Sequence, residues 1–150
     1  MNSKYKSRSV YVDGIRFDSF NESKYYELLK DLKAQSKIIN YELQPKFELQ
    51  PKFKRDGENI RAINYIADFL VYHNDGSEEI IDVKGMATPQ ALVNRKIFLY
   101  KYPEKKLTWV VRDETKSKKW ATMHGEWAEY FDLQKRKKEA RKKKEKKDAK

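Results

Sequence analysis

An acid and a lysine stand two residues apart in an otherwise apolar stretch, Ile80-Ile81-Asp82-Val83-Lys84-Gly85. Side chains two residues apart on a β-strand point to the same face of the sheet. Burying a carboxylate and an ammonium is unfavourable unless the charges are paired or bound to a cation. We therefore predict a reaction centre on a buried strand, built around Asp82 and Lys84.

A second carboxylate, Asp68, lies in the middle of the preceding β-branched and aromatic stretch, residues 63–72. This stretch and the strand of Asp82 are predicted to form a hairpin. A three-residue loop, with Gly76 in the left-handed region, places Asp68 opposite Asp82. A two-residue Asp75-Gly76 turn would instead place the two carboxylates on opposite faces. The loop type thus decides whether the two acids meet.

Two carboxylates side by side in an apolar setting need a positive partner, and oxygen ligands with room for water suit Mg²⁺. Such a cation polarises a phosphate oxygen and lowers the pKa of a bound water, while Lys84 would orient that water or stabilise charge in the transition state. We therefore predict phosphodiester hydrolysis with Mg²⁺, for which Mn²⁺ can substitute. The alternative is a structural ion pair between Lys84 and either Asp68 or Asp82, with the third charge turned to solvent.

Glu22 is a third candidate acid. Ser19-Phe20-Asn21-Glu22 is typical of a capping box at the start of a helix that runs to about Gln35. Glu22 also falls on the helical stripe that faces the core, together with Tyr25, Tyr26, Leu29 and Leu32. Its carboxylate is accordingly predicted to be either a metal ligand or a cap.

The remaining elements follow from turn and cap signals. Asp13-Gly14 predicts a small hairpin over residues 10–17, Thr88-Pro89 begins a helix to Lys101, and residues 107–111 form a strand. Leu43–Phe47 recurs as Leu49–Phe53, and the prolines in this repeat confine it to a sheet edge or an irregular segment. A last helix is marked by aromatic and Met residues: Trp120, Met123, Trp127, Tyr130 and Phe131. The predicted order is αβββαβ, an α/β protein with a mixed sheet flanked by helices.

At 150 residues the chain can bury one core, and with no Cys and two His it has neither a disulfide framework nor a thiolate or His-rich zinc centre. The formal net charge is +11. Residues 135–150 hold eleven Lys or Arg and three acids, or +8, which leaves +3 for residues 1–134. We therefore expect a folded domain over 1–134 and a basic tail over 135–150, either a solvated helix or a disordered arm.

Basic residues outside the acid pair are candidates for contacts with nucleic acid. The alternative is that they are solvated surface charges. The tail is a candidate phosphate-binding arm without sequence preference. The individual candidates are Lys46, Lys52, Arg95, Lys96, Lys135, Arg136, Lys137 and Lys138. The N-terminus lacks an apolar run and no stretch approaches transmembrane length, so we expect a cytosolic protein without a membrane partner.

These motifs resemble the PD-(D/E)XK nuclease superfamily, which includes restriction enzymes and Holliday junction resolvases. More closely, four segments are similar to a family of small bacteriophage proteins of uncharacterised function assigned to that superfamily: Tyr11–Ser19, Leu43–Phe47, Tyr65–Phe69 and Asp82–Gly85. The resemblance spans roughly residues 10 to 112. Ala67 stands where the signature has proline.

The resemblance implies a restriction-endonuclease-like core and a site with Asp68, Asp82, Val83 and Glu22 at the metal and Lys84 as the catalytic lysine. It implies a Mg²⁺-dependent endonuclease acting in the host cytoplasm on duplex DNA or on branched recombination intermediates, with a homodimer left open. The alternative function is a non-catalytic DNA-binding or phage assembly factor that keeps the fold.

Overall fold

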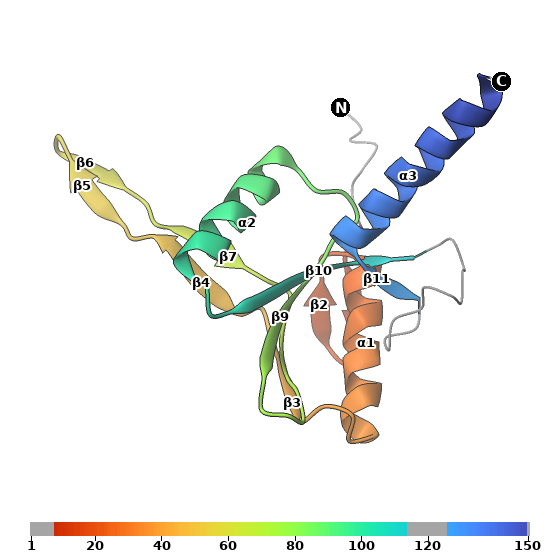
Figure 1. The fold of residues 1–150 in the computed structure, drawn as a ribbon. Coiled ribbons are helices and arrows are strands. Elements are labelled where there is room, and N and C mark those ends of the chain that lie inside the picture. The colour runs from red at the N-terminus through yellow and green to blue at the C-terminus, as the bar shows by residue number, and fades with distance from the viewer. Residues whose placement is uncertain (1–7, 114–125, 150) are drawn as a thin grey trace.

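The computed structural model describes residues 8–113 and 126–149, which form an α/β fold around a mixed five-stranded sheet (Figure 1). The strand order is β11-β10-β9-β8-β3. β9 and β10 are parallel and are joined through helix α2, whereas the other neighbouring strands are antiparallel. The bounds are β3 (Asn40–Leu43), β8 (Phe69–Tyr72), β9 (Glu78–Val83), α2 (Pro89–Lys101), β10 (Lys106–Arg112) and β11 (Trp127–Glu129).

One face of the sheet is covered by α1 (Phe20–Ala34) and by the small hairpin of β1 (Val10–Val12) and β2 (Ile15–Phe17). The predicted capping residue is confirmed, because Ser19 Oγ accepts a hydrogen bond of 3.1 Å from the backbone N–H of Glu22. The predicted Asp13-Gly14 turn is confirmed as well, with both residues at positive φ. The main core lies between α1 and the sheet. Helix α1 contributes Tyr25 and Leu29, and the sheet contributes Phe69, Ile81 and Trp127.

The opposite face carries α2, which begins at the predicted cap: Thr88 Oγ1 accepts from the N–H of Ala91. The second core lies under this helix and contains Leu49, Tyr65, Ala67, Ile80 and Phe98. Because side chains alternate along β9, Ile80 and Asp82 face α2, while Ile81 faces α1. Asp82 is thus on the α2 side, next to Tyr65.

The hairpin between β8 and β9 has the three-residue loop that brings the two acids together. Phe69 pairs with Ile81 and Tyr72 with Glu78. The N–H of His73 donates to the carbonyl of Ser77, and Gly76 has φ +86°. The predicted hairpin is confirmed and its loop is the three-residue alternative, so the register, continued by one residue, sets Asp68 opposite Asp82.

The strand predicted over residues 63–72 is not continuous, and this is a correction. It divides at Ala67 and Asp68 into β7 (Ile63–Ile66) and β8, and β7 pairs with β4 (Lys46–Gln50) outside the main sheet. The segment that pairs with β8 and β7 also bends, between β3 and β4, because Gln44 has φ +50° and Pro45 has no N–H to donate. Beyond β4 and β7, β5 (Phe53–Arg55) and β6 (Glu58–Ile60) continue as a separate two-stranded sheet.

The C-terminal prediction was wrong for Trp127. This residue lies in strand β11, paired with Arg112 of β10, and its ring packs edge-on against Tyr25. Burial of an indole at the sheet edge outweighs the helical spacing. Trp120 and Met123 lie outside the described residues.

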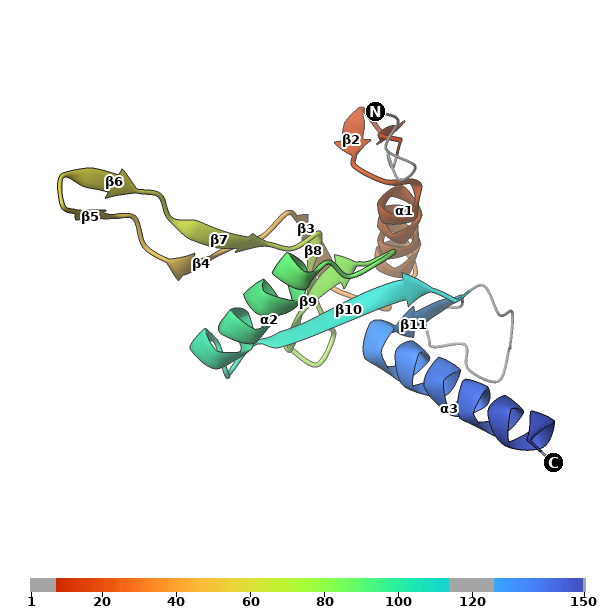
Figure 2. The ribbon, with the colours of Figure 1, turned by 90° about the horizontal axis from the view of Figure 1, so that it is seen from above.

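The last helix is α3 (Tyr130–Asp148), which crosses residues 134 and 135 without a break, so the basic segment is helical. It projects away from the sheet (Figure 2). Among the residues that the structure describes, no helix combines the length and the apolar character needed to cross a membrane.

Candidate functional site

Asp68 and Asp82 lie side by side at the open end of the β8–β9 hairpin, away from its loop. The N–H of Asp68 donates to the carbonyl of Ile81, and the N–H of Val83 donates to Oδ2 of Asp68 at 2.7 Å. Asp82 is buried, with 5% of its surface exposed, and Asp68 is half-buried. The backbone of the strand pair therefore fixes the position of both carboxylates.

The contacts of Asp82 form a chain across three strands. Oδ2 of Asp82 lies 3.0 Å from Nζ of Lys84 and accepts a hydrogen bond of 2.6 Å from the hydroxyl of Tyr65. That hydroxyl accepts a hydrogen bond of 2.8 Å from Nε1 of Trp109, the residue directly across from Asp82 on β10. The ammonium of Lys84 also lies over the Trp109 ring, 4.8 Å from its centroid.

Tyr65 was not predicted as a site residue, and Trp109 was predicted only as part of a strand. Tyr65 and Asp68 have opposite parity along the chain, so on one regular strand they would face opposite ways. The break at Ala67 removes that alternation and turns both toward Asp82. The donor groups of Tyr and Trp on neighbouring apolar strands were the available signal, since such groups find a hydrogen-bond partner when buried.

Burial and the neighbouring charge of Asp82 raise the pKa of Asp68 to about 9, with a smaller contribution from Glu22 and an opposing one from the N–H of Val83. The ammonium of Lys84 contacts Asp82 of this pair at 3.0 Å. Without a further cation the pair therefore retains a proton at neutral pH. The oxygen-rich donor set suits a hard divalent cation such as Mg²⁺, and binding it would replace that proton.

Glu22 lies near the acid pair, although it does not form a three-carboxylate metal site with it among the described residues. It is half-buried in the first turn of α1, and burial raises its pKa, with a contribution from the charge of Asp82. Glu22 and Asp68 both line a cavity of about 90 Å³. However, in the ranges 8–113 and 126–149 no group of three or more His, Cys, Asp or Glu residues is arranged to hold a metal ion. The structure thus unites Asp68, Asp82 and Lys84, with Val83 contacting Asp68 and Glu22 at the margin.

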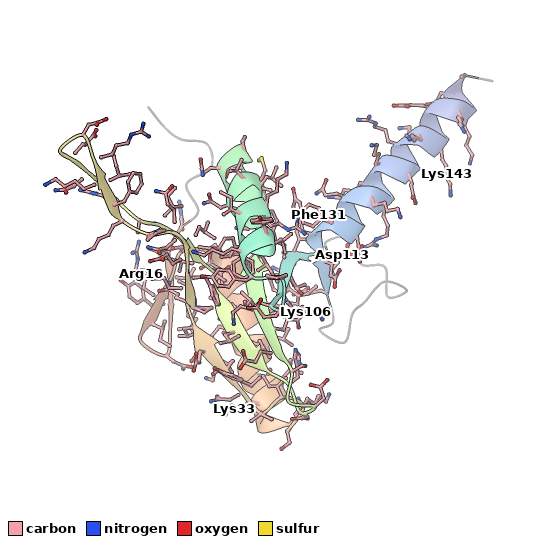
Figure 3. All side chains as sticks on the ribbon, turned by 60° about the vertical axis from the view of Figure 1, so that its left-hand side comes forward. Arg16, Lys33, Lys106, Asp113, Phe131 and Lys143 are labelled. Atoms are coloured by element: carbon pink, nitrogen blue, oxygen red, sulfur yellow. The ribbon has the colours of Figure 1, made fainter. Side chains whose placement is uncertain are left out.

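The predicted nucleic-acid contacts occupy two kinds of environment. Lys46, Lys52, Lys96, Lys135, Lys137 and Lys138 are exposed. Arg95 is half-buried, with its guanidinium 4.2 Å from the centroid of the Phe131 ring and 5.6 Å from that of Trp109. Arg136 donates to buried Asp113 at 3.2 Å and so ties α3 to the end of β10, whereas Lys143 lies far along the projecting helix (Figure 3).

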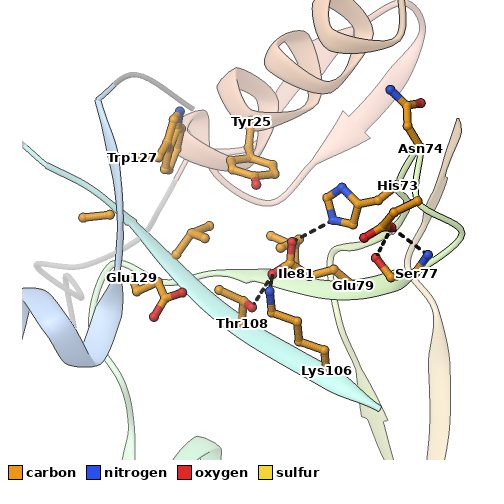
Figure 4. A pocket seen from close by; sticks show the side chains of 13 residues that line it. Tyr25, His73, Asn74, Ser77, Glu79, Ile81, Lys106, Thr108, Trp127 and Glu129 are labelled. Carbon is orange, nitrogen blue, oxygen red and sulfur yellow. Dashed lines mark hydrogen bonds and ion pairs between the residues drawn. The ribbon is translucent and has the colours of Figure 1, made fainter. Parts of the chain in front are cut away.

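A larger cavity, about 440 Å³, opens on the α1 side of the sheet (Figure 4). Its buried acid, Glu79, has hydrogen-bonding partners in His73, Thr108 and Lys106 at 2.6 to 3.1 Å. Burial opposes ionisation of Glu79, but these hydrogen bonds prevail and lower its pKa. Glu79 is therefore an ionised carboxylate whose charge is compensated by its hydrogen-bonding partners, in contrast to Asp68.

The described chain is thus an α/β protein with a buried acid pair and a lysine at the end of a mixed sheet. Residues 2–120 match the family model described as protein of unknown function, DUF1064, and the chain belongs to this family. No curated protein matches the chain. The family description assigns no activity, so the relationship to PD-(D/E)XK nucleases remains a prediction.

Proposed function

We propose that this protein is a metal-dependent DNA endonuclease of the PD-(D/E)XK type that hydrolyses phosphodiester bonds in the host cytoplasm. The observation that carries the proposal is the Asp68–Asp82 pair, whose burial and mutual repulsion raise the pKa of Asp68 to about 9. A purely structural Lys84–Asp82 ion pair explains one carboxylate. It leaves the second one facing the first at an energetic cost.

The order of elements around the site supports the same proposal. Helix α1, strands β3, β8 and β9, helix α2 and strand β10 follow one another, with the extra strands inserted between them. This corresponds to the αβββαβ order on which the resemblance rests. The acids lie at the start of β8 and near the end of β9, and the lysine follows β9 directly.

The residues have separable roles in this proposal. Asp68 and Asp82 would hold the cation, with Val83 and Glu22 as further ligands; Mg²⁺ or Mn²⁺, when bound, supplies a Lewis acid for the phosphate and lowers the pKa of water. Tyr65 fixes the rotation of the Asp82 carboxylate. Lys84 supplies a positive charge beside the position where negative charge develops on the phosphate. The exposed cations of α3 attract the DNA backbone.

The direct test is incubation with labelled linear, nicked and four-way DNA in Mg²⁺, Mn²⁺ or EDTA. We expect metal-dependent cleavage, and for D82N and K84A a rate at least roughly 100-fold lower. The matched control is E78Q, which removes an exposed carboxylate from the same strand. Binding of DNA by D82N should stay within severalfold of wild type. Unchanged cleavage in both D82N and K84A would refute the site assignment.

A binding readout independent of cleavage separates a metal site from a structural ion pair. A cation that binds only the folded carboxylate pair raises the melting temperature by mass action. We expect Mg²⁺ or Mn²⁺ to raise it for wild type and E78Q and not for D82N. DNA binding without either cleavage or a metal-dependent shift would favour the non-catalytic DNA-binding alternative.

A further inference from the structure

The strands β5 and β6 form a two-stranded ribbon, residues 52–61, that projects away from the main sheet (Figures 1 and 2). A two-residue turn, Asp56-Gly57, closes it, with φ +50° and +78°. Every residue of β5 is exposed. An isolated ribbon has little stability of its own, and this one extends strands β4 and β7 without joining the main sheet.

The two faces of the ribbon differ sharply in charge. Phe53 pairs with Ile60 and Arg55 with Glu58, so one face has an apolar brace and a cross-strand pair of opposite charges. Lys54 pairs with Asn59 on the other face. Continuing the alternation by one residue adds Lys52 and Arg61 to that face, which we call the basic face: Lys52, Lys54, Asn59 and Arg61.

The cations of the basic face are uncommitted. In the described parts of the chain, no ion pair or side-chain hydrogen bond involves Lys52, Lys54 or Arg61. The side-chain amide of Asn59 likewise has no hydrogen bond there. On the other face, Arg55 is 3.8 Å from Asp56, although both side chains are largely exposed. The basic face therefore presents three positive charges and one amide, with no carboxylate among them, to whatever approaches it.

We propose that this ribbon lies in the major groove of B-form DNA with the basic face toward the bases. The inference rests on the proposed function for its choice of DNA as the partner. The major groove, about 12 Å wide, admits a two-stranded ribbon, and an Asn amide can pair with the edge of adenine there. The flanking Lys and Arg side chains reach the phosphates on either side. A-form RNA has a major groove too narrow for such a ribbon, so this contact requires B-form DNA.

The covalent path from the ribbon to the site sets the position of this contact. Asn59 is nine residues before Asp68, which at about 3.3 Å per residue places it at most about 30 Å away. At about 3.4 Å per base pair, this is roughly nine base pairs. The ribbon thus reads duplex at most about one helical turn from the cleaved phosphate, on one side of the cut.

The decisive comparison is between K54A and R55A, which remove one exposed cation from opposite faces of the same strand. Both are made in the D82N background so that the DNA stays intact, and binding to a 30-base-pair duplex is measured by fluorescence anisotropy. We expect K54A to weaken binding about tenfold and R55A less than twofold. Thermal unfolding checks that each variant is folded. Equal losses in the two variants would overturn the groove assignment, because they would indicate unspecific attraction.

Two further arms fix the kind of partner and the position. Duplex RNA of the same sequence should compete poorly for wild type, and equal competition would refute a major-groove contact. Selection from randomised duplexes should reveal a preference within about nine base pairs of the mapped cut that N59A abolishes. If K54A weakens duplex binding more than R55A does, but wild type does not cleave DNA, the nuclease proposal fails and the ribbon assignment stands. Cleavage with no difference between K54A and R55A would refute the ribbon assignment and leave the nuclease proposal intact.

Discussion

The hydroxyl of Tyr65 donates to Oδ2 of Asp82, which is the same oxygen that the ammonium of Lys84 approaches. Both donors therefore hold the carboxylate through one oxygen, and Oδ1 takes no part in these two contacts. Trp109 orients the hydroxyl in turn by donating to it. A buried network in which each donor has an acceptor specifies a single geometry for Asp82.

Y65F tests this network. The change removes the donor to Asp82 and leaves Nε1 of Trp109 without its acceptor, so we expect a loss of about 1 to 3 kcal/mol in the free energy of unfolding, measured with urea. Y102F is the control, because Tyr102 donates from an exposed site to the carbonyl of Glu48. Metal affinity should fall for Y65F alone. Equal destabilisation by the two changes would argue against a special role for Tyr65.

D68N should make the metal-free protein more stable at neutral pH. The pKa of Asp68 is raised from 3.8 to about 9 in the fold, so the folded state holds a proton that the unfolded state has lost. The stabilisation from this proton is full below the unfolded pKa and disappears as the pH rises toward about 9. In EDTA, wild type should therefore lose stability between pH 5 and 8.5 relative to D68N. Parallel curves in urea titrations across this range would contradict the raised pKa.

K84Q should separate metal binding from catalysis. The ammonium lies 3.0 Å from Oδ2 of Asp82 and competes with a cation for the same carboxylate. Removing it should strengthen Mn²⁺ binding, measured by calorimetry, while lowering the cleavage rate by roughly 100-fold or more. The control is K106Q, which removes an ammonium from the cavity on the other sheet face. Weaker Mn²⁺ binding by K84Q would show that the lysine supports the metal site instead.

The lysines of α3 should control the salt dependence of DNA binding. Replacing Lys142, Lys143, Lys144, Lys146 and Lys147 with Gln keeps the Arg136–Asp113 contact that anchors the helix. If these lysines neutralise about five phosphates, the slope of log affinity against log salt should fall by roughly four to five units. Single-turnover cleavage at saturating DNA should change little. An unchanged slope would mean that this half of the helix is merely solvated.

The local signals in the sequence predicted most of what positions the site. The side-chain oxygens of Ser19 and Thr88 accept from backbone N–H groups three residues on, and the loop ending at Gly76 is closed by a backbone hydrogen bond, so their effect could be predicted from short segments. The register of β8 and β9 followed from the loop, and with it the meeting of Asp68 and Asp82.

The features that were missed depend on contacts distant in sequence. Strands β7 and β8 are separate because the chain that pairs with them bends at Gln44 and Pro45, between β3 and β4. Tyr65 reaches Asp82 only as a result of that break. Trp127 pairs with Arg112 at the sheet edge, and helical spacing alone could not reveal this pairing.

The two sides of the site differ in how firmly they are attached. The backbone of Asp68 is bonded to Ile81 of β9 and Asp82 is paired with Trp109 of β10, whereas α2 has only Phe98 buried among its thirteen residues. Elements with few buried side chains open at low free energy, and their amides exchange early with solvent. Opening of α2 would carry Arg95 away from Trp109 and remove Phe98 from the ring of Tyr65, whose hydroxyl holds Asp82. Fluctuations of α2 would therefore reach the carboxylate of Asp82 through Tyr65, while the backbone pairing of β8 and β9 is kept.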